Sequence, residues 1–131
     1  MIAIQGIYPP IPTFFDENED LDLTTLREHL MRLKAAGITS FVALGSNGEA
    51  VHLDRDERHV VIATARAEAG SDGQVLAGAG TDSTRETIAL CQLAAEAGAD
   101  LALVLPPHYY RGQMNATAIR AYYLAVALKL G

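Results

Sequence analysis

Basic residues and cysteine are scarce in this sequence. Ten lysine and arginine residues stand against 16 acidic ones, which gives a formal net charge of −6 and a pI near 5.0. The basic residues are scattered rather than gathered into a stripe, so the chain lacks the electrostatic surface of a nucleic-acid-binding protein. Its single cysteine, Cys91, cannot close an intrachain disulfide, and such a chain is typical of the reducing cytoplasm.

Long apolar runs are missing as well. No run reaches the roughly 18 residues that a membrane-spanning helix needs. Residues 1–6 lack the charged start and the long apolar core of a signal peptide. With half of its 131 residues hydrophobic and a fifth charged, the sequence has the composition of one soluble globular domain. We therefore expect a cytoplasmic protein with no membrane and no nucleic-acid partner.

A repeat is visible along the chain. Three alanine-rich amphipathic segments each end in an Ala-Gly pair, and a short apolar run follows each pair within a few residues. These runs are Thr39–Leu44, Gln74–Ala77 and Leu101–Leu105. The glycines of the pairs, Gly37, Gly70 and Gly98, suit the left-handed position that often follows a helix. The repeat therefore has the form of successive βα units.

Side chains that cap helices mark where the helical segments begin. Asp22 precedes leucines at helical spacing. An acceptor followed three residues later by glutamate, the pattern of a capping box, occurs twice. The two pairs are Asp54 with Glu57 and Ser83 with Glu86. A last helix is expected over residues 115–130, where apolar side chains recur at spacings of three and four.

The predicted order is a strand and a helix, repeated four times. Ile4–Tyr8 is the candidate first strand, stopped by the prolines that follow it. Alternating strands and helices imply a parallel sheet with right-handed crossovers. The strands are apolar without alternation, as expected where both faces of a sheet are covered. An open doubly wound sheet and a (β/α)8 barrel both fit this pattern, although four βα units are half of what an eight-stranded barrel needs.

The loop after the second predicted strand, Gly45-Ser46-Asn47-Gly48-Glu49, is the first candidate site. Backbone N–H groups and the Ser46 hydroxyl could hold a carboxylate or a phosphate there. Alternatively, the two glycines serve only the backbone angles of a βα turn. The loop matches neither the Walker motif nor the dinucleotide-binding fingerprint.

Two further loops follow the later strands. In residues 78–83 the glycines could let a ligand approach, but the pattern favours a tight turn in front of a helix that Ser83 caps. In residues 106–112 two prolines lead into Tyr109 and Tyr110, which could pass protons or could pack at a subunit contact. His108 has no second ligand at metal spacing, so we expect no metal and no cofactor.

Together, these loops resemble the N-terminal half of the dihydrodipicolinate synthase/N-acetylneuraminate lyase family, which are Schiff-base class I aldolases and lyases on a (β/α)8 barrel. The matching segments span nearly the whole chain and occur in order. They are residues 6–10 with Thr13-Phe14, then residues 45–49, 76–80 and 106–112. Ser46-Asn47 and Tyr109-Tyr110-Arg111-Gly112 look most like the 4-hydroxy-2-oxoglutarate aldolase branch.

The resemblance implies roles for five residues. Gly45, Ser46, Asn47 and Gly48 would hold the carboxylate of pyruvate or a related 2-oxo acid. Ser46 and Tyr109 would be catalytic members of a proton relay. The resemblance further implies a homodimer or homotetramer in which Tyr109 crosses a subunit interface, and no cofactor beyond the lysine of the Schiff base.

One departure from the family is plain. The family forms its Schiff base on a lysine of the sixth strand, whereas the two lysines here, Lys34 and Lys129, fall in predicted helices. We therefore expect residues 1–131 to be the N-terminal half of a barrel domain and to be inactive alone. Two alternatives remain: a non-catalytic half-barrel that binds or assembles with a partner, and an open α/β phosphate-binding domain.

Overall fold

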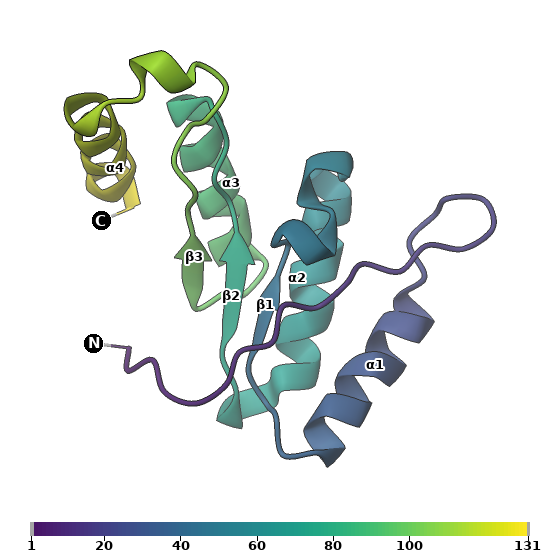
Figure 1. The fold of residues 1–131 in the computed structure, drawn as a ribbon. Coiled ribbons are helices and arrows are strands. Elements are labelled where there is room, and N and C mark those ends of the chain that lie inside the picture. The colour runs from purple at the N-terminus through teal and green to yellow at the C-terminus, as the bar shows by residue number, and fades with distance from the viewer. Residues whose placement is uncertain (1, 131) are drawn as a thin grey trace.

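The computed structural model describes residues 2–130, which form a small parallel sheet with helices packed beside it (Figure 1). Short 3₁₀ turns, η1 to η4, lie between the main elements. The helices and strands are α1 (Leu23–Ala35), β1 (Phe41–Ala43), α2 (Arg55–Ala69), β2 (Val75–Gly78), α3 (Thr84–Glu96), β3 (Leu101–Leu103) and α4 (Ala116–Leu130).

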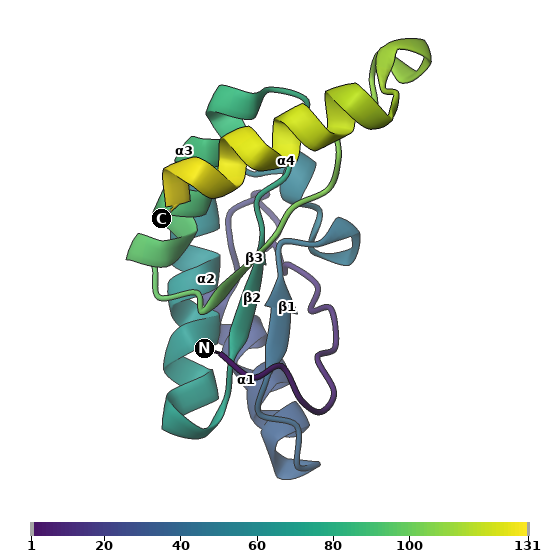
Figure 2. The ribbon, with the colours of Figure 1, turned by 90° about the vertical axis from the view of Figure 1, so that its left-hand side faces the viewer.

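The three strands pair in parallel in the order β1-β2-β3. Val42 pairs with Leu76, which in turn pairs with Leu101. Each helix packs against the next along the chain; α2 packs against β1 and β2, and α3 packs against β3 (Figure 2). The predicted parallel βα arrangement is confirmed. β1 and β3 are shorter than the predicted runs Thr39–Leu44 and Leu101–Leu105, whereas β2 is as long as the predicted run Gln74–Ala77 and begins one residue later.

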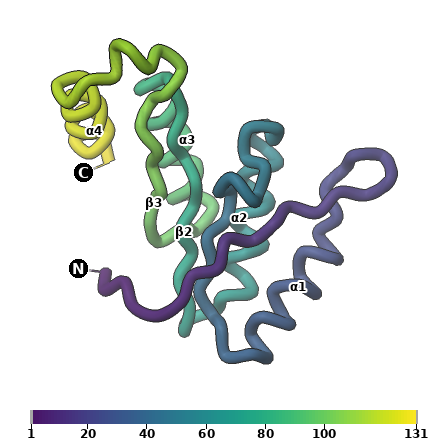
Figure 3. Tube along the Cα trace, in the orientation of Figure 1, coloured from purple at the N-terminus to yellow at the C-terminus, as the bar shows by residue number. Residues whose placement is uncertain are grey.

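The predicted first strand at residues 4–8 is wrong. The opening segment, purple in Figure 3, runs without strand structure through these residues. It meets the sheet later, where Pro10 forms a single parallel bridge to Val42. The N–H of Ile11 donates to the carbonyl of Val42 at 2.9 Å, and the N–H of Val42 donates to the carbonyl of Pro9 at 3.0 Å. Three prolines remove most of the other donors, so the pairing stays short.

The predicted helix signals are confirmed, with one exception. The side chains of Asp22 and Asp54 accept N–H bonds from the first turns of α1 and α2, and Glu57 completes the capping box of α2. Ser83 caps α3, but Glu86 does not return the bond, because the Glu86 carboxylate pairs with Arg55 of α2. The glycines after α1, α2 and α3 all have positive φ.

The two faces of the sheet are covered unequally. On the face toward the helices, Phe41, Ala43, Val75 and Ala77 are completely buried. On the other face, Val42 and Leu76 are only half-buried, and further along β3 the side chain of Leu103 is 40% exposed. Apolar residues thus lie on both faces. The described chain covers the helix-side face fully at β1 and β2, but leaves Ala102 of β3 exposed on that face.

The amino ends of β2 and β3 are tied together by one ion pair. The guanidinium of Arg66 donates to the carboxylate of Asp100 at 2.6 Å and to the carbonyl of Gly73 at 2.8 Å. The same Asp100 oxygen accepts the N–H of Val75 at 2.8 Å. This network fixes the end of the sheet opposite to the loops that follow the strands.

None of the helices in residues 2–130 has the length and the apolar character that a membrane span requires.

Thr13 joins the opening segment to the turn after β1, and this contact can be tested. The buried Thr13 hydroxyl donates to the carbonyl of Gly48 at 2.7 Å. Thr13→Val keeps the shape but loses the donor, so we expect the free energy of unfolding in urea to fall by about 1–3 kcal/mol. Thr24→Val, at an exposed position of α1, is the matched control and should stay within about 0.5 kcal/mol of wild type. Equal losses in the two variants would contradict a structural role for the hydroxyl.

Candidate functional site

The three loops that follow β1, β2 and β3 meet at the carboxyl edge of the sheet. Parallel strands bring their carboxyl ends to one side, which is where α/β proteins bind ligands. A cavity of about 440 Å³ opens between these loops. Its wall includes Gly45 and Ser46 from the first loop, Gly80 and Asp82 from the second, and His108 from the third.

Two glycines let the backbones of neighbouring loops touch. A Cβ on Gly78 would lie 1.9 Å from the carbonyl oxygen of Leu44, and a Cβ on Gly80 would lie 2.3 Å from the backbone nitrogen of Leu105. Neither glycine has a positive φ. The prediction that they serve a tight turn is therefore incomplete, because their main contribution is room for the adjacent backbones.

In the turn after β1, the residues with unusual backbone angles are not the glycines. Gly45 is extended, with φ −76° and ψ −170°, whereas the flanking residues Leu44 and Glu49 have φ of 59° and 52°. The alternative that the two glycines are needed for backbone angles is therefore wrong. Left-handed angles at a leucine and a glutamate are costly, and such strain concentrates at functional sites.

Several hydrogen-bond donors of this turn are unused. Its internal bonds run from the N–H of Gly48 to the carbonyl of Gly45 at 3.0 Å and from the N–H of Glu49 to the carbonyl of Ser46 at 3.1 Å. Within residues 2–130, no acceptor is recorded for the N–H groups of Ser46 and Asn47 or for the Ser46 hydroxyl. Ser46 is exposed at the cavity wall. The turn can therefore donate to an anion without breaking its own bonds.

One guanidinium belongs to the cavity wall. Arg58, in the first turns of α2, is half-buried, and its Nε donates to the carbonyl of Leu53 at 3.3 Å. A second nitrogen of the same group donates to the carbonyl of Ala50. Burial lowers the pKa of Arg58 from its ordinary value, although the group stays charged at neutral pH. The Arg58 guanidinium thus holds residues 50–53, which follow the turn, and adds positive potential to the cavity.

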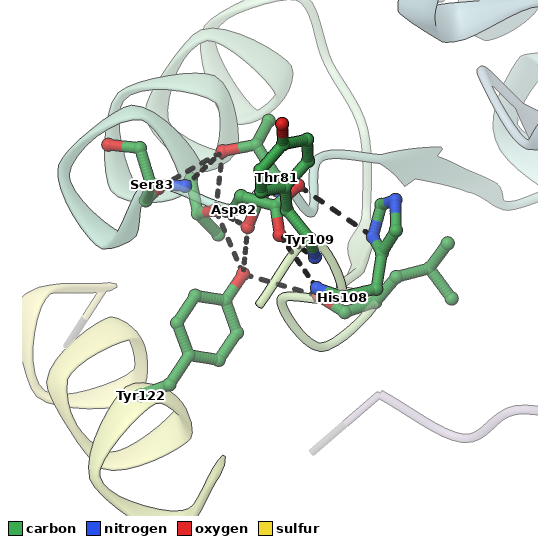
Figure 4. A network of polar contacts seen from close by, with 8 residues as sticks. Thr81, Asp82, Ser83, His108, Tyr109 and Tyr122 are labelled. Atoms are coloured by element: carbon green, nitrogen blue, oxygen red, sulfur yellow. Dashed lines mark hydrogen bonds and ion pairs between the residues drawn. The ribbon is translucent and has the colours of Figure 1, made fainter. Parts of the chain in front are cut away.

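The tyrosine loop is attached to the rest of the site through Asp82 (Figure 4). One carboxylate oxygen of Asp82 accepts the N–H of His108 at 2.6 Å and the N–H of Tyr109 at 2.8 Å. The rings of Tyr109 and Tyr110 meet edge to face, with centroids 5.0 Å apart, and both are more than 70% exposed. Tyr109 therefore stands at the rim of the site rather than inside the cavity.

The site residues predicted from the sequence are only partly brought together. Gly45 and Ser46 line the cavity, whereas Asn47 and Gly48 belong to the same turn but do not line it. Among residues 2–130, no hydrogen bond joins Ser46 to Tyr109. The substrate-binding role of the turn and the relay between its serine and Tyr109 stay predictions.

Among residues 2–130, no lysine lines the cavity. Lys34 lies on α1 and Lys129 on α4, and both are exposed, as their positions in predicted helices indicate. In the part of the chain that the structure describes, no three His, Cys, Asp or Glu side chains cluster as a metal site.

Sequence reasoning missed Asp82 and Arg58. Asp82 directly precedes the helix cap Ser83 in a loop at the carboxyl edge of the sheet, and this position was the available signal. Arg58 begins the second turn of α2, two residues before the exposed Val60, and nothing in the spacing marks it as a wall of the cavity.

Comparison with known proteins gives a consistent result. The sequence profile of the dihydrodipicolinate synthetase family matches residues 3–130. L-threo-3-deoxy-hexylosonate aldolase of Hypocrea jecorina is 50% identical over 127 residues, covering 93% of this chain and 40% of that protein. The probable mitochondrial 4-hydroxy-2-oxoglutarate aldolase of Emericella nidulans is 45% identical over 128 residues, covering 95% and 41%.

Solved structures agree in fold. A dihydrodipicolinate synthase family protein from Coccidioides immitis superposes with a TM-score of 0.86 at 39% identity, over 94% of this chain and 40% of that one. An E. coli prophage protein of the same family, solved in complex with pyruvate, gives 0.88 at 32% identity, over 98% and 42%. The chain spans about two fifths of the length of these relatives.

The three-stranded parallel sheet with its helices thus matches an N-terminal part of the family's (β/α)8 barrel. This match favours the barrel over the open doubly wound sheet that the sequence pattern left possible. With a profile match over residues 3–130 and relatives at 45–50% identity, the chain belongs to the dihydrodipicolinate synthetase family.

Proposed function

We propose that this chain forms the carboxylate-binding half of a lyase that acts on pyruvate or a related 2-oxo acid. The observation that carries the proposal is the turn at Gly45 and Ser46, which lines a cavity at the carboxyl edge of the sheet and keeps donors unused. The aldolase names of the most similar relatives support the same class of reaction. A neighbouring structure solved with pyruvate supports the choice of ligand.

The chemistry of such a lyase divides between two groups. An amine of the protein attacks the 2-oxo carbon and forms an imine, which withdraws electrons from the carbon–carbon bond to be broken or made. The turn around Ser46 holds the carboxylate next to that carbon and so orients the substrate. The Ser46 hydroxyl, with Tyr109, would carry the protons that the attack and the dehydration require.

We further propose that the amine lies outside this chain, because Lys34 and Lys129 are exposed on helices away from the cavity wall. The half-covered apolar face of the sheet supports this view, since the barrel of which it forms part would cover that face. The exposed Tyr109 ring is the group that would reach a neighbouring subunit in a homodimer or homotetramer. The cytoplasmic location stays a prediction from the cysteine content.

Pyruvate binding tests the carboxylate pocket directly. Ser46→Ala removes a hydroxyl donor to a charged acceptor, so we expect the Kd for pyruvate, measured by isothermal titration calorimetry, to rise about tenfold. Ser71→Ala, at an exposed serine near the amino edge of the sheet, is the matched control and should leave the Kd unchanged. Equal affinity in the Ser46 variant and the wild type would count against this turn as the carboxylate site.

Borohydride trapping tests the position of the amine. When this chain is incubated with pyruvate and borohydride, we expect mass spectrometry to find no reduced imine on Lys34 or Lys129, because both amines are exposed on helices and neither lines the cavity that would hold the substrate. The family member from E. coli that was solved with pyruvate serves as the positive control. An adduct on either lysine, accompanied by aldolase turnover, would contradict the proposal.

A half-barrel that assembles with a partner is the second candidate function. It is favoured by the open edge of β3, which pairs with no further strand among residues 2–130, and by the exposed side chains of Leu103, Leu105 and Leu128. Under this candidate, analytical ultracentrifugation should show one discrete oligomer with a cooperative thermal transition. A monomer, or a polydisperse aggregate, would contradict it.

A further inference from the structure

We propose that Asp82 is a positioning residue, which fixes the loop of residues 106–110 and thereby the place of Tyr109 at the rim of the cavity. The inference rests on the proposed function for the role of Tyr109. Its geometric content, that one carboxylate determines where this loop lies, stands on the contacts of Asp82 alone.

The carboxylate of Asp82 accepts hydrogen bonds from two consecutive backbone N–H groups of the loop. One oxygen accepts the N–H of His108 at 2.6 Å and that of Tyr109 at 2.8 Å, and the other lies 3.8 Å from Nδ1 of His108 (Figure 4). The Tyr109 N–H first, and the His108 N–H second, hold the pKa of Asp82 below its ordinary value. The group is therefore charged at neutral pH, the state in which it accepts hydrogen bonds most strongly.

Nothing else in the described chain is recorded as bonding this loop to another element. The carbonyl of Tyr110 accepts only the N–H of Gln113, which belongs to the turn that follows. The rings of Tyr109 and Tyr110 are 75% and 71% exposed, so packing against the core does not hold them. The two prolines before His108 restrict the chain but provide no donor. Asp82 is thus the hydrogen-bonding attachment of the loop.

Thr81, the residue directly before Asp82, is held by a network of hydrogen bonds. The N–H of its neighbour Thr81 donates to the hydroxyl of Thr87, which is completely buried, at 3.0 Å. The Tyr122 hydroxyl of α4 lies 2.9 Å from the same Thr87 oxygen and within hydrogen-bond distance of the carbonyls of Thr81 and Leu105. The segment before α3 therefore has a fixed place against both β3 and α4. A carboxylate on such a segment can position His108 and Tyr109, which lie between the Leu105 carbonyl, contacted by Tyr122, and the Tyr110 carbonyl, contacted by Gln113.

Amide hydrogen exchange tests the inference without requiring catalysis. In the wild-type chain, the amides of His108 and Tyr109 should exchange about tenfold more slowly than that of Tyr110, which donates to no recorded acceptor. Asp82→Ala should abolish this difference. Asp82→Asn keeps an acceptor oxygen in place and should restore most of the protection.

Asp72→Ala is the matched control, because Asp72 is also exposed and lies in η3 near the opposite edge of the sheet. It should leave the exchange of both loop amides unchanged. Fast exchange of His108 and Tyr109 in the wild type would overturn the inference, as would unchanged protection in Asp82→Ala. If Asp82→Ala fails to fold, the wild-type rates and Asp82→Asn still decide the matter. A failure of the proposed function would appear instead as absent pyruvate binding, with the exchange pattern intact.

Discussion

The site depends on close contact between the backbones of neighbouring loops at the carboxyl edge of the sheet. Gly78 lies against the carbonyl of Leu44, and Gly80 lies against the backbone of Leu105, at distances that no other residue would allow. These two contacts bring the turn of Ser46, the segment of Asp82 and the tyrosine loop around one cavity. Without them, three separate βα loops would not share a wall.

The two edges of the sheet have different roles: the amino edge contributes to stability, and the carboxyl edge carries the candidate site. At the amino edge, Arg66 and Asp100 form an ion pair and also bond backbone groups, because Arg66 donates to the carbonyl of Gly73 and Asp100 accepts the N–H of Val75. The polar groups at that edge therefore have partners within the protein. At the carboxyl edge, the donors of Ser46 have no recorded protein acceptor among the described residues, and strained backbone flanks the turn. Fixed donors that do not have to rearrange are what a bound carboxylate needs. The division matches the general placement of ligand sites in parallel α/β proteins.

Local signals in the sequence predicted most of the fold, because they depend on chemistry within a few residues. The caps at Asp22 and Asp54 and the helix-ending glycines needed no tertiary information. The prediction of the first strand failed because the pairing of Pro10 with Val42 is a contact between segments that are distant in the sequence. Such a contact depends on hydrogen bonds that no local pattern reveals. The turn around Ser46 could be recognised as a candidate site from its own residues. The hydrogen bond from the Tyr109 N–H to Asp82 joins residues 27 positions apart, and no local pattern predicts it.

The central claim is that the loops after β1, β2 and β3 form one pocket for the carboxylate of a 2-oxo acid. Backbone amide chemical shifts, followed while pyruvate is added to this chain, test it most directly. The amides of Gly45, Ser46 and Asn47 should shift in a saturable manner together with those around Gly80, while the amides near Arg66 and Asp100 stay in place. Shifts centred on the amino edge of the sheet, or none at saturating pyruvate, would contradict the claim.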